Sequence, residues 1–586
     1  MVPLSETMAT FYHALLLDLS MTAYLAVIPL LGYIIWLLSG WKSVNIKWIS
    51  IYNLVLLVLF SIISVVNFNI YREWGTKVNA KAIGFAFSSP GEAMASGASS
   101  PIALSLLVLL VLIVAGFFLQ KRLIPKQLSF EKSALGWRIT IAVLLLPLTF
   151  MFIRGGFKGS PITQSMAYFS KHQLLNHAAV NTEWNLLRSL LSEKMTNHNP
   201  YVYLDPKKAE QLIQELYAVE KDSTTRILTT DRPNVVMVII ESFTADLTQT
   251  LGNETGITPH FDSLMNKGVL FSQAYASGSR TDKGIIASLA GFPTLGAGSI
   301  VKFPEKMQKL PAISQSLAKN GYHTSFYYGG ESEFDNYKAF ILSHDYQKLI
   351  DKNNFTGNTP KSFWGQYDEA VFDKQLQDLN TEKQPFYSTL LTLTNHEPYT
   401  LPGKHKFGNT NNVAQFKSTA YYTDSVINAY LNNAKKQAWY PNTLFIFVAD
   451  HGHVLPKEIH DISTPGRYHI PLLFFGEVIK PEFRGRKFSN IASQVDIATT
   501  LLAQLNIPAK DFNWSKNLLN PYTKSFAYFS WDNGMGFIDN EQCVTFDNVG
   551  KMTLYNSNDK DKEGTEKRLD LAKAYLQQVY QQFIAL

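Results

Sequence analysis

Four long apolar stretches separated by polar loops occupy the first 153 residues. They cover residues 19–38, 48–70, 101–120 and, more briefly, 137–153. About 20 apolar residues in a helix, rising about 1.5 Å each, span the ~30 Å hydrocarbon core of a bilayer. The stretches carry no charge at their centres, which disfavours helices buried in a soluble core. The pattern predicts about four transmembrane helices in a membrane domain over residues 1–154.

The charges of the loops predict the orientation of these helices. Most of the basic residues lie in two loops, and they are Lys42, Lys47, Lys121, Arg122, Lys126 and Lys132. Positively charged loops tend to stay in the cytoplasm. We therefore expect a multi-pass protein of the cytoplasmic (inner) membrane with residues 155–586 extracellular or periplasmic. A cleaved signal peptide fits poorly, because no basic segment precedes the first stretch.

From residue 232 onward, apolar runs of strand length alternate with helical segments. The predicted strands are 235–240, 323–328, 386–393, 443–448 and 470–475, and the main predicted helices are 285–290, 312–319, 418–435 and 495–505. Such alternation predicts an α/β domain with a central, mostly parallel sheet, which we place at residues 229–586. Residues 155–228 predict a helical linker, with helices at 173–191 and 206–221.

Composition and charge separate the two parts. Charged residues make up 17% of the chain, below the ~25% of a typical soluble domain. The 46% of hydrophobic residues excludes intrinsic disorder, and the single cysteine, Cys543, excludes a disulfide scaffold. Residues 1–150 hold 10 basic and 5 acidic residues, so they carry most of the formal net charge of +6. The outer part is almost neutral and has no basic run, which gives no support for a nucleic-acid partner.

Polar residues suited to metal binding follow three of the predicted strands. Glu241 follows the first strand, His396 the third, and Asp450 with His451 the fourth. Ligands of parallel sheets bind beyond the carboxyl ends of the strands, so these side chains should meet at one edge. Carboxylate and imidazole groups suit a divalent cation such as Mn²⁺, Zn²⁺ or Mg²⁺. Taken singly, each residue is better explained as a helix cap or an ordinary histidine, so only their co-occurrence favours a metal site.

A loop of small residues, 276–284, leads into the predicted helix at 285–290 and contains Thr281. A hydroxyl at the start of a helix gains from the helix dipole, and a bound metal ion lowers its pKa, so Thr281 is a candidate nucleophile. The structural alternative is that Thr281 only caps the helix.

Five motifs, taken in order, resemble the lipoteichoic acid synthase and phosphoglycerol transferase family of the sulfatase/alkaline phosphatase superfamily. They are NVVMVIIES at 234–242, TPHFD at 258–262, GSRTD at 278–282, TNHEP at 394–398 and ADHG at 449–452. The resemblance covers about residues 233–505, and it implies a sulfatase-like α/β catalytic domain. Members of the family usually have five membrane helices, whereas four are predicted here.

The resemblance also implies an activity. Glu241, Thr281, Asp450 and His451 would hold a divalent metal ion, with Mn²⁺ expected first and Zn²⁺ or Mg²⁺ as alternatives. Thr281 would be the nucleophile, and His396 would contact the substrate phosphate or the leaving group. The expected reaction moves a phospholipid head group, phosphoglycerol or similar, through a phospho-threonine intermediate to an acceptor hydroxyl on a glycan or lipid.

Further residues are expected around the substrate. Arg280, Trp364 and Asn336 are expected to contact it together with His396. His453 and His469 are candidates for a second metal site, as in phosphoethanolamine transferases of the superfamily.

The segment 328–336 departs from the family pattern. It is comparable to a segment that carries a phosphate-binding arginine in synthases of the Gram-positive type, but here it has no arginine. It carries Glu331, Glu333 and Asp335 instead, which would favour a cationic head group such as ethanolamine, unless they form a plain solvated loop.

Other functions remain to be weighed. A formylglycine sulfatase is excluded, because the loop at Thr281 has no Cys-x-Pro-x-Arg context. A phosphoethanolamine transferase or a phosphodiesterase of the same fold stays open, since transfer and hydrolysis differ only in the acceptor. A non-enzymatic lipid-sensing membrane protein is disfavoured, because all four expected metal ligands are present.

Overall fold

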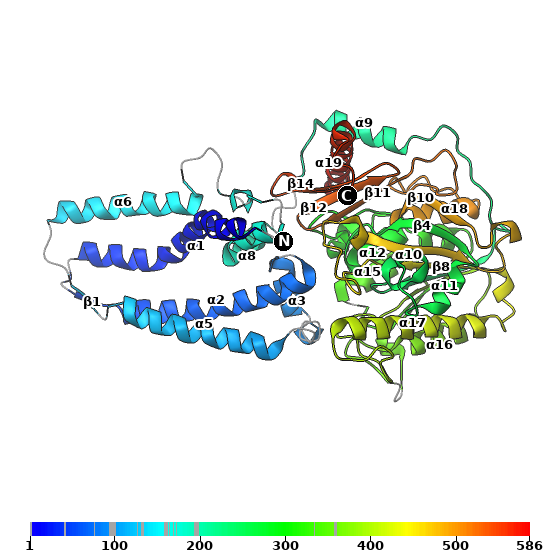
Figure 1. The fold of residues 1–586 in the computed structure, drawn as a ribbon, viewed down its shortest axis with the longest axis horizontal. Helices are drawn as coiled ribbons and strands as arrows, with labels where there is room; N and C mark the ends of the chain where they lie inside the picture. Colours follow the sequence, from blue (N-terminus) through cyan, green and yellow to red (C-terminus); the bar gives the residue numbers. More distant parts are fainter. Residues whose placement is uncertain are drawn as a thin grey trace. The chain divides into compact units, whose positions relative to one another are not determined.

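The computed structural model describes the chain apart from residues 1–2, 40, 42, 76, 89, 93–100, 126, 130–133, 157–161, 163, 168, 171–172, 193–197, 333 and 357–359. The chain forms two compact units (Figure 1): residues 1–196 with 549–552, and residues 197–548 with 553–586. The division at residue 196 falls inside the segment predicted as a linker. Residues 197–228, including helix α9 (Pro206–Tyr217), therefore belong to the second unit.

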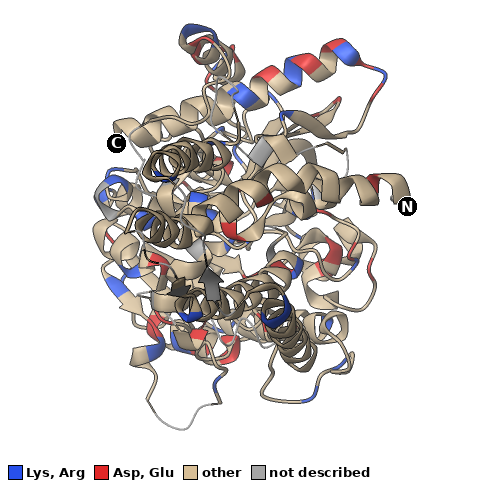
Figure 2. Ribbon diagram, turned by 90° about the vertical axis from the view of Figure 1, so that its left-hand side faces the viewer, with Lys and Arg blue, Asp and Glu red and all other residues tan. Residues whose placement is uncertain are grey.

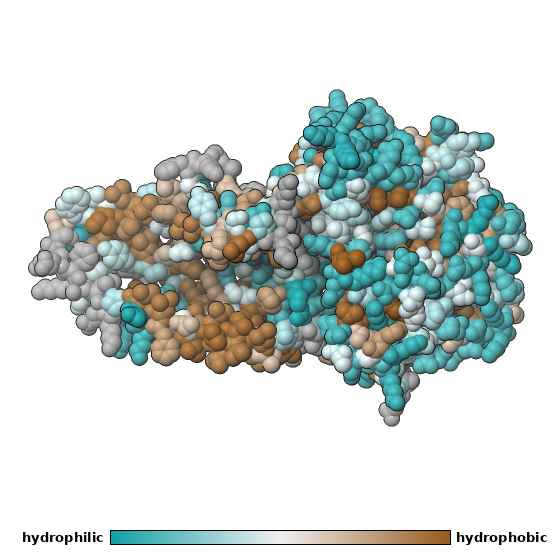
Figure 3. Space-filling model, viewed as in Figure 1, coloured by the Kyte–Doolittle hydropathy of each residue, from teal (hydrophilic) through white to brown (hydrophobic). Residues whose placement is uncertain are grey.

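Four helices of the first unit are long and apolar enough to cross a membrane. They are α1 (Leu4–Ser39), α2 (Lys47–Trp74), α5 (Ile102–Leu123) and α6 (Leu135–Arg154). Few of their residues are charged (Figure 2), and hydrophobic residues gather on their surface (Figure 3). A contiguous apolar surface of this size in a soluble unit would drive association, so its natural solvent is lipid. The four predicted helices are confirmed, although α1 begins at Leu4 rather than at residue 19.

Polar contacts join these helices in pairs. The Ser20 hydroxyl on α1 donates to the Ile153 carbonyl on α6 at 2.8 Å, and the Gln120 amide on α5 donates to the Ser50 carbonyl on α2 at 2.7 Å. The helix predicted at 173–191 is in fact two, α7 (Gln173–Ala179) and α8 (Thr182–Ser192). The break is explained by the side chain of Asn181, which accepts a hydrogen bond from the Trp184 amide and so caps the second helix.

An eight-stranded sheet forms the core of the second unit, in the order β10-β4-β9-β8-β3-β7-β5-β6. Its strands are β10 (Lys487–Ser493), β4 (Val269–Tyr275), β9 (His469–Phe475), β8 (Thr443–Ala449), β3 (Asn234–Ile240), β7 (Phe386–Leu391), β5 (His323–Tyr328) and β6 (Lys348–Ile350). Only β9 runs antiparallel to its neighbours, which confirms the mostly parallel sheet. Every residue of β3 and β8 is buried, as expected for central strands covered on both faces.

Helices pack on this sheet in two groups. One contains α11 (Pro259–Met265), α16 (Asp368–Leu379) and α17 (Asn412–Ala434), and the other contains α12 (Thr281–Ala290), α14 (Ile313–Lys319) and α18 (Ile497–Gln504). The helix predicted at 418–435 begins earlier because the side chain of Asn411 caps it by accepting from the Ala414 amide. The segment predicted as a helix at 495–505 opens with a 3₁₀ turn at Gln494–Asp496 before α18 begins.

A smaller antiparallel sheet follows near the C-terminus. Its strands are β11 (Phe526–Trp531), β12 (Gly534–Asp539), β13 (Cys543–Asp547) and β14 (Met552–Asn556). Helix α19 (Lys562–Ala585) packs on β12, β13 and α9. The amide of Ser530 on β11 donates to the Ser277 carbonyl, so this sheet supports the loop that precedes Thr281.

Because β8 lies in the middle of the sheet, we expect its buried side chains to contribute strongly to folding stability. The fully buried Phe447 packs edge-to-face on Phe261, so Phe447→Ala leaves a cavity and should cost about 3–5 kcal/mol of folding stability. The fall in melting temperature of the full-length protein in detergent measures this effect. Val219→Ala, at a residue of the same unit that is 44% exposed, is the control and should leave the melting temperature almost unchanged. Equal melting temperatures for both variants would contradict the assigned burial.

Candidate active site

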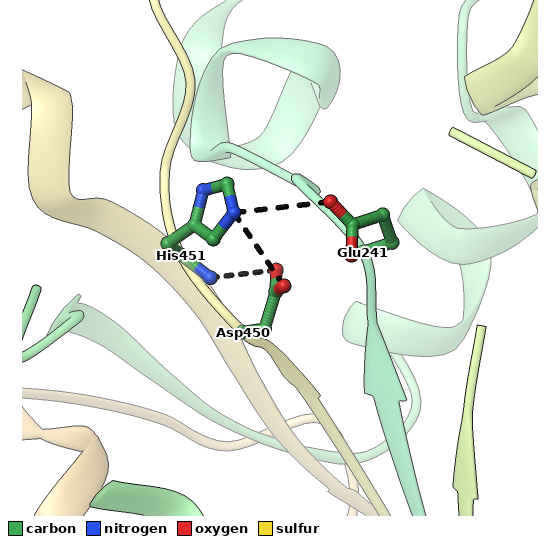
Figure 4. A group of neighbouring side chains, drawn as sticks. All are labelled: Glu241, Asp450 and His451. Atoms are coloured by element: carbon green, nitrogen blue, oxygen red, sulfur yellow. Dashed lines mark hydrogen bonds and ion pairs between the residues drawn. The ribbon is translucent and has the colours of Figure 1, made fainter. Parts of the chain in front are cut away.

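Two carboxylates emerge side by side from the ends of adjacent strands. The register pairs Ile240 of β3 with Ala449 of β8, so the next residues, Glu241 and Asp450, lie together (Figure 4). Both are buried, with 3% of Glu241 and none of Asp450 exposed. Ligand atoms of the two carboxylates lie within 4.8 Å of each other. Two negative charges at that distance repel by roughly 3–4 kcal/mol at an effective dielectric constant of about 20. Burial raises the pKa of Glu241 well above its ordinary value, and the Asp450 carboxylate raises it further.

His451 directs a ring nitrogen at this pair. Its Nε2 lies 3.5 Å from Asp450 Oδ2 and 3.8 Å from Glu241 Oε1 (Figure 4). The other nitrogen, Nδ1, lies 2.9 Å from the Gly452 carbonyl oxygen, which can only accept a hydrogen bond. Nδ1 therefore carries the proton, and burial lowers the pKa of His451, so the neutral ring presents the Nε2 lone pair to the carboxylates. Metal-binding histidines are commonly oriented by a backbone carbonyl in this way.

The cluster has the chemistry of a divalent metal site. Ligand atoms of Glu241, Asp450 and His451 all lie within 4.8 Å of one another. Asp450 Oδ2 is buried and accepts no hydrogen bond from the described residues, whereas Oδ1 accepts from the Ser242 and His451 amides. Two carboxylates and a neutral imidazole that converge on one point are typical ligands of a divalent cation. The residues therefore fit a divalent metal ion.

The backbone at Ser242 helps to form this arrangement. Ser242 has a φ of 53°, in the left-handed region that residues other than glycine rarely adopt. In this conformation its amide donates to Asp450 Oδ1 at 2.7 Å and its hydroxyl donates to Glu241 Oε1 at 2.9 Å. Strained backbone of this kind is concentrated at functional sites.

Thr281 lies beside the cluster at the start of α12. Its hydroxyl donates to Glu241 Oε2 at 3.3 Å. The N-cap position belongs to Arg280, and Thr281 is the first residue of the helix, so the capping role considered as the alternative does not apply. The structure thus brings together the four residues that the resemblance assigned to the metal.

Two contacts hold α12 against the end of β8. A Cβ atom at Gly284 would lie 1.9 Å from the Asp450 carbonyl oxygen, so only glycine allows the helix to approach this closely. Gln494 donates to the carbonyls of Ala449 and Asp450 at 2.6 Å each and accepts from the Ser277 amide. This buried glutamine therefore joins the loop before Thr281 to the strand that carries Asp450.

His396 and Trp364 form a second side of the site. His396 Nδ1 and Trp364 Nε1 both donate to the Glu397 carbonyl, and the two ring centroids lie 4.4 Å apart. Burial lowers the pKa of His396, so its neutral ring offers a lone pair at Nε2. The charge of Arg280 acts on both His396 and His451, which locates its guanidinium near the cluster.

Asn336 forms part of a turn outside the carboxylate cluster. Its side-chain amide donates to the Val301 carbonyl at 3.1 Å, and its φ of 59° forms the turn into α15 (Tyr337–Ser343). The structure thus shows Asn336 holding the backbone of a turn, and no contact joins it to the carboxylate cluster. In the same loop, Glu331 pairs with Lys352 and Asp335 pairs with Lys302, whereas Glu333 lies outside the described residues.

The two histidines expected at a second metal site are occupied in other ways. His453 Nδ1 accepts from the Leu455 amide at 3.0 Å, and its ring stacks on Phe416. His469 Nε2 lies 2.9 Å from the Ser272 carbonyl, and its ring stacks on Tyr275. In the part of the chain that the structure describes, the one cluster of three potential ligands is Glu241, Asp450 and His451. His453 and His469 are not brought together.

The sequence reasoning missed two residues of this region, Gln494 and Arg467. Arg467 lies in the turn Pro465–Tyr468, just before β9, and is only 8% exposed. Its charge acts on His451 and His453. The only signal was a basic residue immediately before a predicted strand, which is too common to indicate a site.

The chain is similar to known proteins over the part that contains this site. The sulfatase family model matches residues 233–507. The chain is 24% identical to the lipoteichoic acid synthase-like protein YvgJ of Bacillus subtilis over 335 residues, which cover 53% of each chain. It is 28% identical to the lipoteichoic acid synthase of Staphylococcus aureus over 311 residues, or 48% of this chain and 46% of that one. The chain therefore spans about half the length of the curated relatives it matches.

Two solved structures share the fold. A protein of the alkaline phosphatase superfamily from Vibrio parahaemolyticus is 26% identical with a TM-score of 0.57, covering 65% of this chain and 97% of that one. The lipoteichoic acid synthase LtaP from Listeria monocytogenes is 19% identical with a TM-score of 0.53, covering 64% of this chain and 98% of that one.

The close approach of Gly284 to the Asp450 carbonyl predicts that a larger residue at position 284 weakens metal binding. In Gly284→Ala the new methyl group must push α12 away from the Asp450 carbonyl, which separates Thr281 from Glu241. Mn²⁺ affinity, measured by titration calorimetry on the full-length protein, should fall by at least about tenfold, in the range seen when the surroundings of metal ligands are altered. Gly403→Ala, where a Cβ meets open space, should bind Mn²⁺ as the parent does. Unchanged Mn²⁺ affinity in Gly284→Ala would show that metal binding does not require the close approach of α12 to the Asp450 carbonyl.

Proposed function

We propose that this chain, a lipoteichoic acid synthase-like member of the sulfatase/alkaline phosphatase superfamily, transfers a phospholipid head group to an acceptor hydroxyl outside the cytoplasmic membrane. The observation that carries the proposal is the contact of Thr281 with a buried cluster of two carboxylates and a neutral imidazole. The relatives named as lipoteichoic acid synthases support a phosphoryl-group chemistry. The four apolar helices support a donor that resides in the bilayer.

The proposed metal ion is held by Glu241, Thr281, Asp450 and His451. A divalent cation bound there supplies positive charge that lowers the pKa of a hydroxyl group and stabilises negative charge on phosphoryl oxygens. The carboxylate-rich donor set favours Mn²⁺, with Zn²⁺ or Mg²⁺ as alternatives.

In the first displacement Thr281 Oγ1 forms a bond to phosphorus, and the bond from phosphorus to the diacylglycerol oxygen breaks. One proton is thereby transferred from Thr281 to the leaving diacylglycerol. His396 is the residue suited to relay it, because its Nδ1 proton is engaged by the Glu397 carbonyl and its Nε2 is free to accept and return a proton. The low pKa of His396 keeps Nε2 unprotonated at neutral pH.

In the second displacement an acceptor hydroxyl, on a glycan or lipid, attacks the phospho-threonine. Its proton passes by the same route to Thr281 Oγ1, which restores the hydroxyl. Trp364, which packs on His396, covers this side of the site and orients the imidazole.

Phosphoglycerol is the head group that the described loop favours over ethanolamine. A cationic amine needs unpaired carboxylates, yet Glu331 and Asp335 each pair with a lysine. A phosphoglycerol group has no positive charge to satisfy. Phosphatidylglycerol is therefore the proposed donor, and transfer to water in place of an acceptor would be the corresponding phosphodiesterase reaction.

Mass spectrometry of the intact protein tests the mechanism. After incubation with Mn²⁺ and phosphatidylglycerol, the protein should gain the mass of one glycerophosphoryl group, and peptide mapping should locate it on Thr281. Thr281→Ala should show no adduct and lose at least about 10³-fold in turnover, since it lacks the nucleophile. Ser288→Ala, on the same helix at a buried hydroxyl that bonds to no described residue, is the matched control. Full activity of Thr281→Ala would sink the mechanism, and an adduct from phosphatidylethanolamine alone would reassign the donor.

Cysteine labelling in sealed right-side-out membrane vesicles tests the orientation. In a Cys543→Ser background, a membrane-impermeant maleimide should label Asp231→Cys, which lies at an exposed position of the second unit. Pro125→Cys, at an exposed position in the predicted cytoplasmic loop after α5, should label only after the vesicles are opened. The reverse pattern would place the catalytic unit in the cytoplasm.

A further inference from the structure

Arg467 carries a buried guanidinium that has no partner among the residues that the structure describes, and its charge acts on His451 of the carboxylate cluster. It makes no side-chain hydrogen bond and no ion pair with the described residues, and its Nη1 is fully buried. Burial lowers its pKa to about 10, which still leaves it charged at neutral pH. An unpaired charge of this kind is costly, and buried arginines are normally paired with an anion.

No described carboxylate lies within ion-pair distance of the Arg467 guanidinium. The largest charge effects on it come from Tyr468, Arg280 and Tyr399, and the effect of Asp461 is smaller. Both phenols are neutral at physiological pH, and the second arginine repels. Arg280, by contrast, faces Asp532, Asp282 and Glu397. Of the two arginines, Arg467 is therefore the one with fewer negative charges from the protein around it.

His453 adds a donor on the same side. Its Nδ1 accepts from the Leu455 amide, so in the neutral ring the proton is on Nε2. The charges of Arg467, His451 and His396 act on the His453 ring, so the ring lies on the same side of the site as Arg467. Stacking on Phe416, at 4.6 Å between centroids, fixes its orientation.

Close backbone packing fixes Arg467 as well. A Cβ atom at Gly452 would lie 2.1 Å from the Arg467 carbonyl oxygen, and one at Gly466 would lie 2.2 Å from His460 Nδ1. The His460 ring pairs in turn with Asp246 at 3.0 Å. The turn that carries Arg467 is thus held directly against the residue that follows His451. A preorganised donor of this kind binds its ligand without a large loss of side-chain freedom.

We infer that Arg467, with the Nε2–H of His453, binds the non-bridging oxygens of the phosphate group that the site transfers. A guanidinium offers paired N–H donors that match two oxygens of a phosphate. The site would thereby obtain, from the turn before β9, the arginine that the segment 328–336 lacks. The inference rests on the proposed function for its substrate class, but anion binding itself requires no turnover.

Binding of inorganic phosphate and of glycerol 3-phosphate tests the inference. Full-length protein in detergent with saturating Mn²⁺ is titrated with each anion, and affinity is taken from calorimetry and from the rise in melting temperature. Arg467→Gln should weaken phosphate binding by at least about tenfold, the loss expected for charge-assisted hydrogen bonds, and Arg467→Lys by less. His453→Phe, which keeps the stacking but removes the donor, should also weaken it. Mn²⁺ affinity should stay unchanged in all three variants.

Arg484→Gln is the matched control, because Arg484 is exposed on the same unit and binds only the Ile479 and Glu477 carbonyls. If Arg467→Gln does not fold, Arg467→Lys and His453→Phe decide the question. Parental phosphate affinity in the variants, or no phosphate binding by the parent, would overturn the inference. Head-group transfer with parental KM in Arg467→Gln would overturn it while the proposed function stands. If phosphate binding depends on Arg467 but no adduct forms on Thr281, the anion-binding site is supported and the proposed function is contradicted.

Discussion

The burial of two carboxylates at the ends of adjacent strands is the constraint on which the site depends. Glu241 and Asp450 lie together because β3 and β8 pair in register, and neither can move to solvent without breaking the sheet. Repulsion between the two carboxylates raises the free energy of the folded state, and a bound cation lowers it again. The neutral His451, the hydroxyl of Thr281 and the strained Ser242 are all arranged around that pair.

Groups of both signs lie around the carboxylate pair. The pair follows the ends of β3 and β8, and the charges of Arg280 and Arg467 act on the ring of His451. In the proposed mechanism a phosphate diester would bind between the cation and these arginines, which would stabilise its developing negative charge from both sides. The proposed function requires only these local positive charges, so the nearly neutral charge of the outer part as a whole is compatible with an anionic substrate.

The sequence predicts the parts of this structure that repeat a simple pattern. The four membrane helices, the central strands and the polar residues that end them follow from hydrophobic periodicity and from the geometry of parallel sheets. The small second sheet and strands β4, β6 and β10 were not predicted: β4 and β10 mix polar with apolar residues, and β6 has only three residues. Asn336, His453 and His469 could not be assigned from sequence, because the direction of an amide or a ring nitrogen depends on which backbone group lies opposite.

The distances along the chain between Glu241, Thr281 and Asp450 have a consequence for folding. These residues come from β3, α12 and β8, so their approach closes long loops and is complete only when the middle of the sheet has formed. A partly folded or truncated chain lacks this arrangement of the three side chains. In the proposed mechanism, binding of the metal ion would therefore require completed folding, and the chain would stay inactive until its core is assembled.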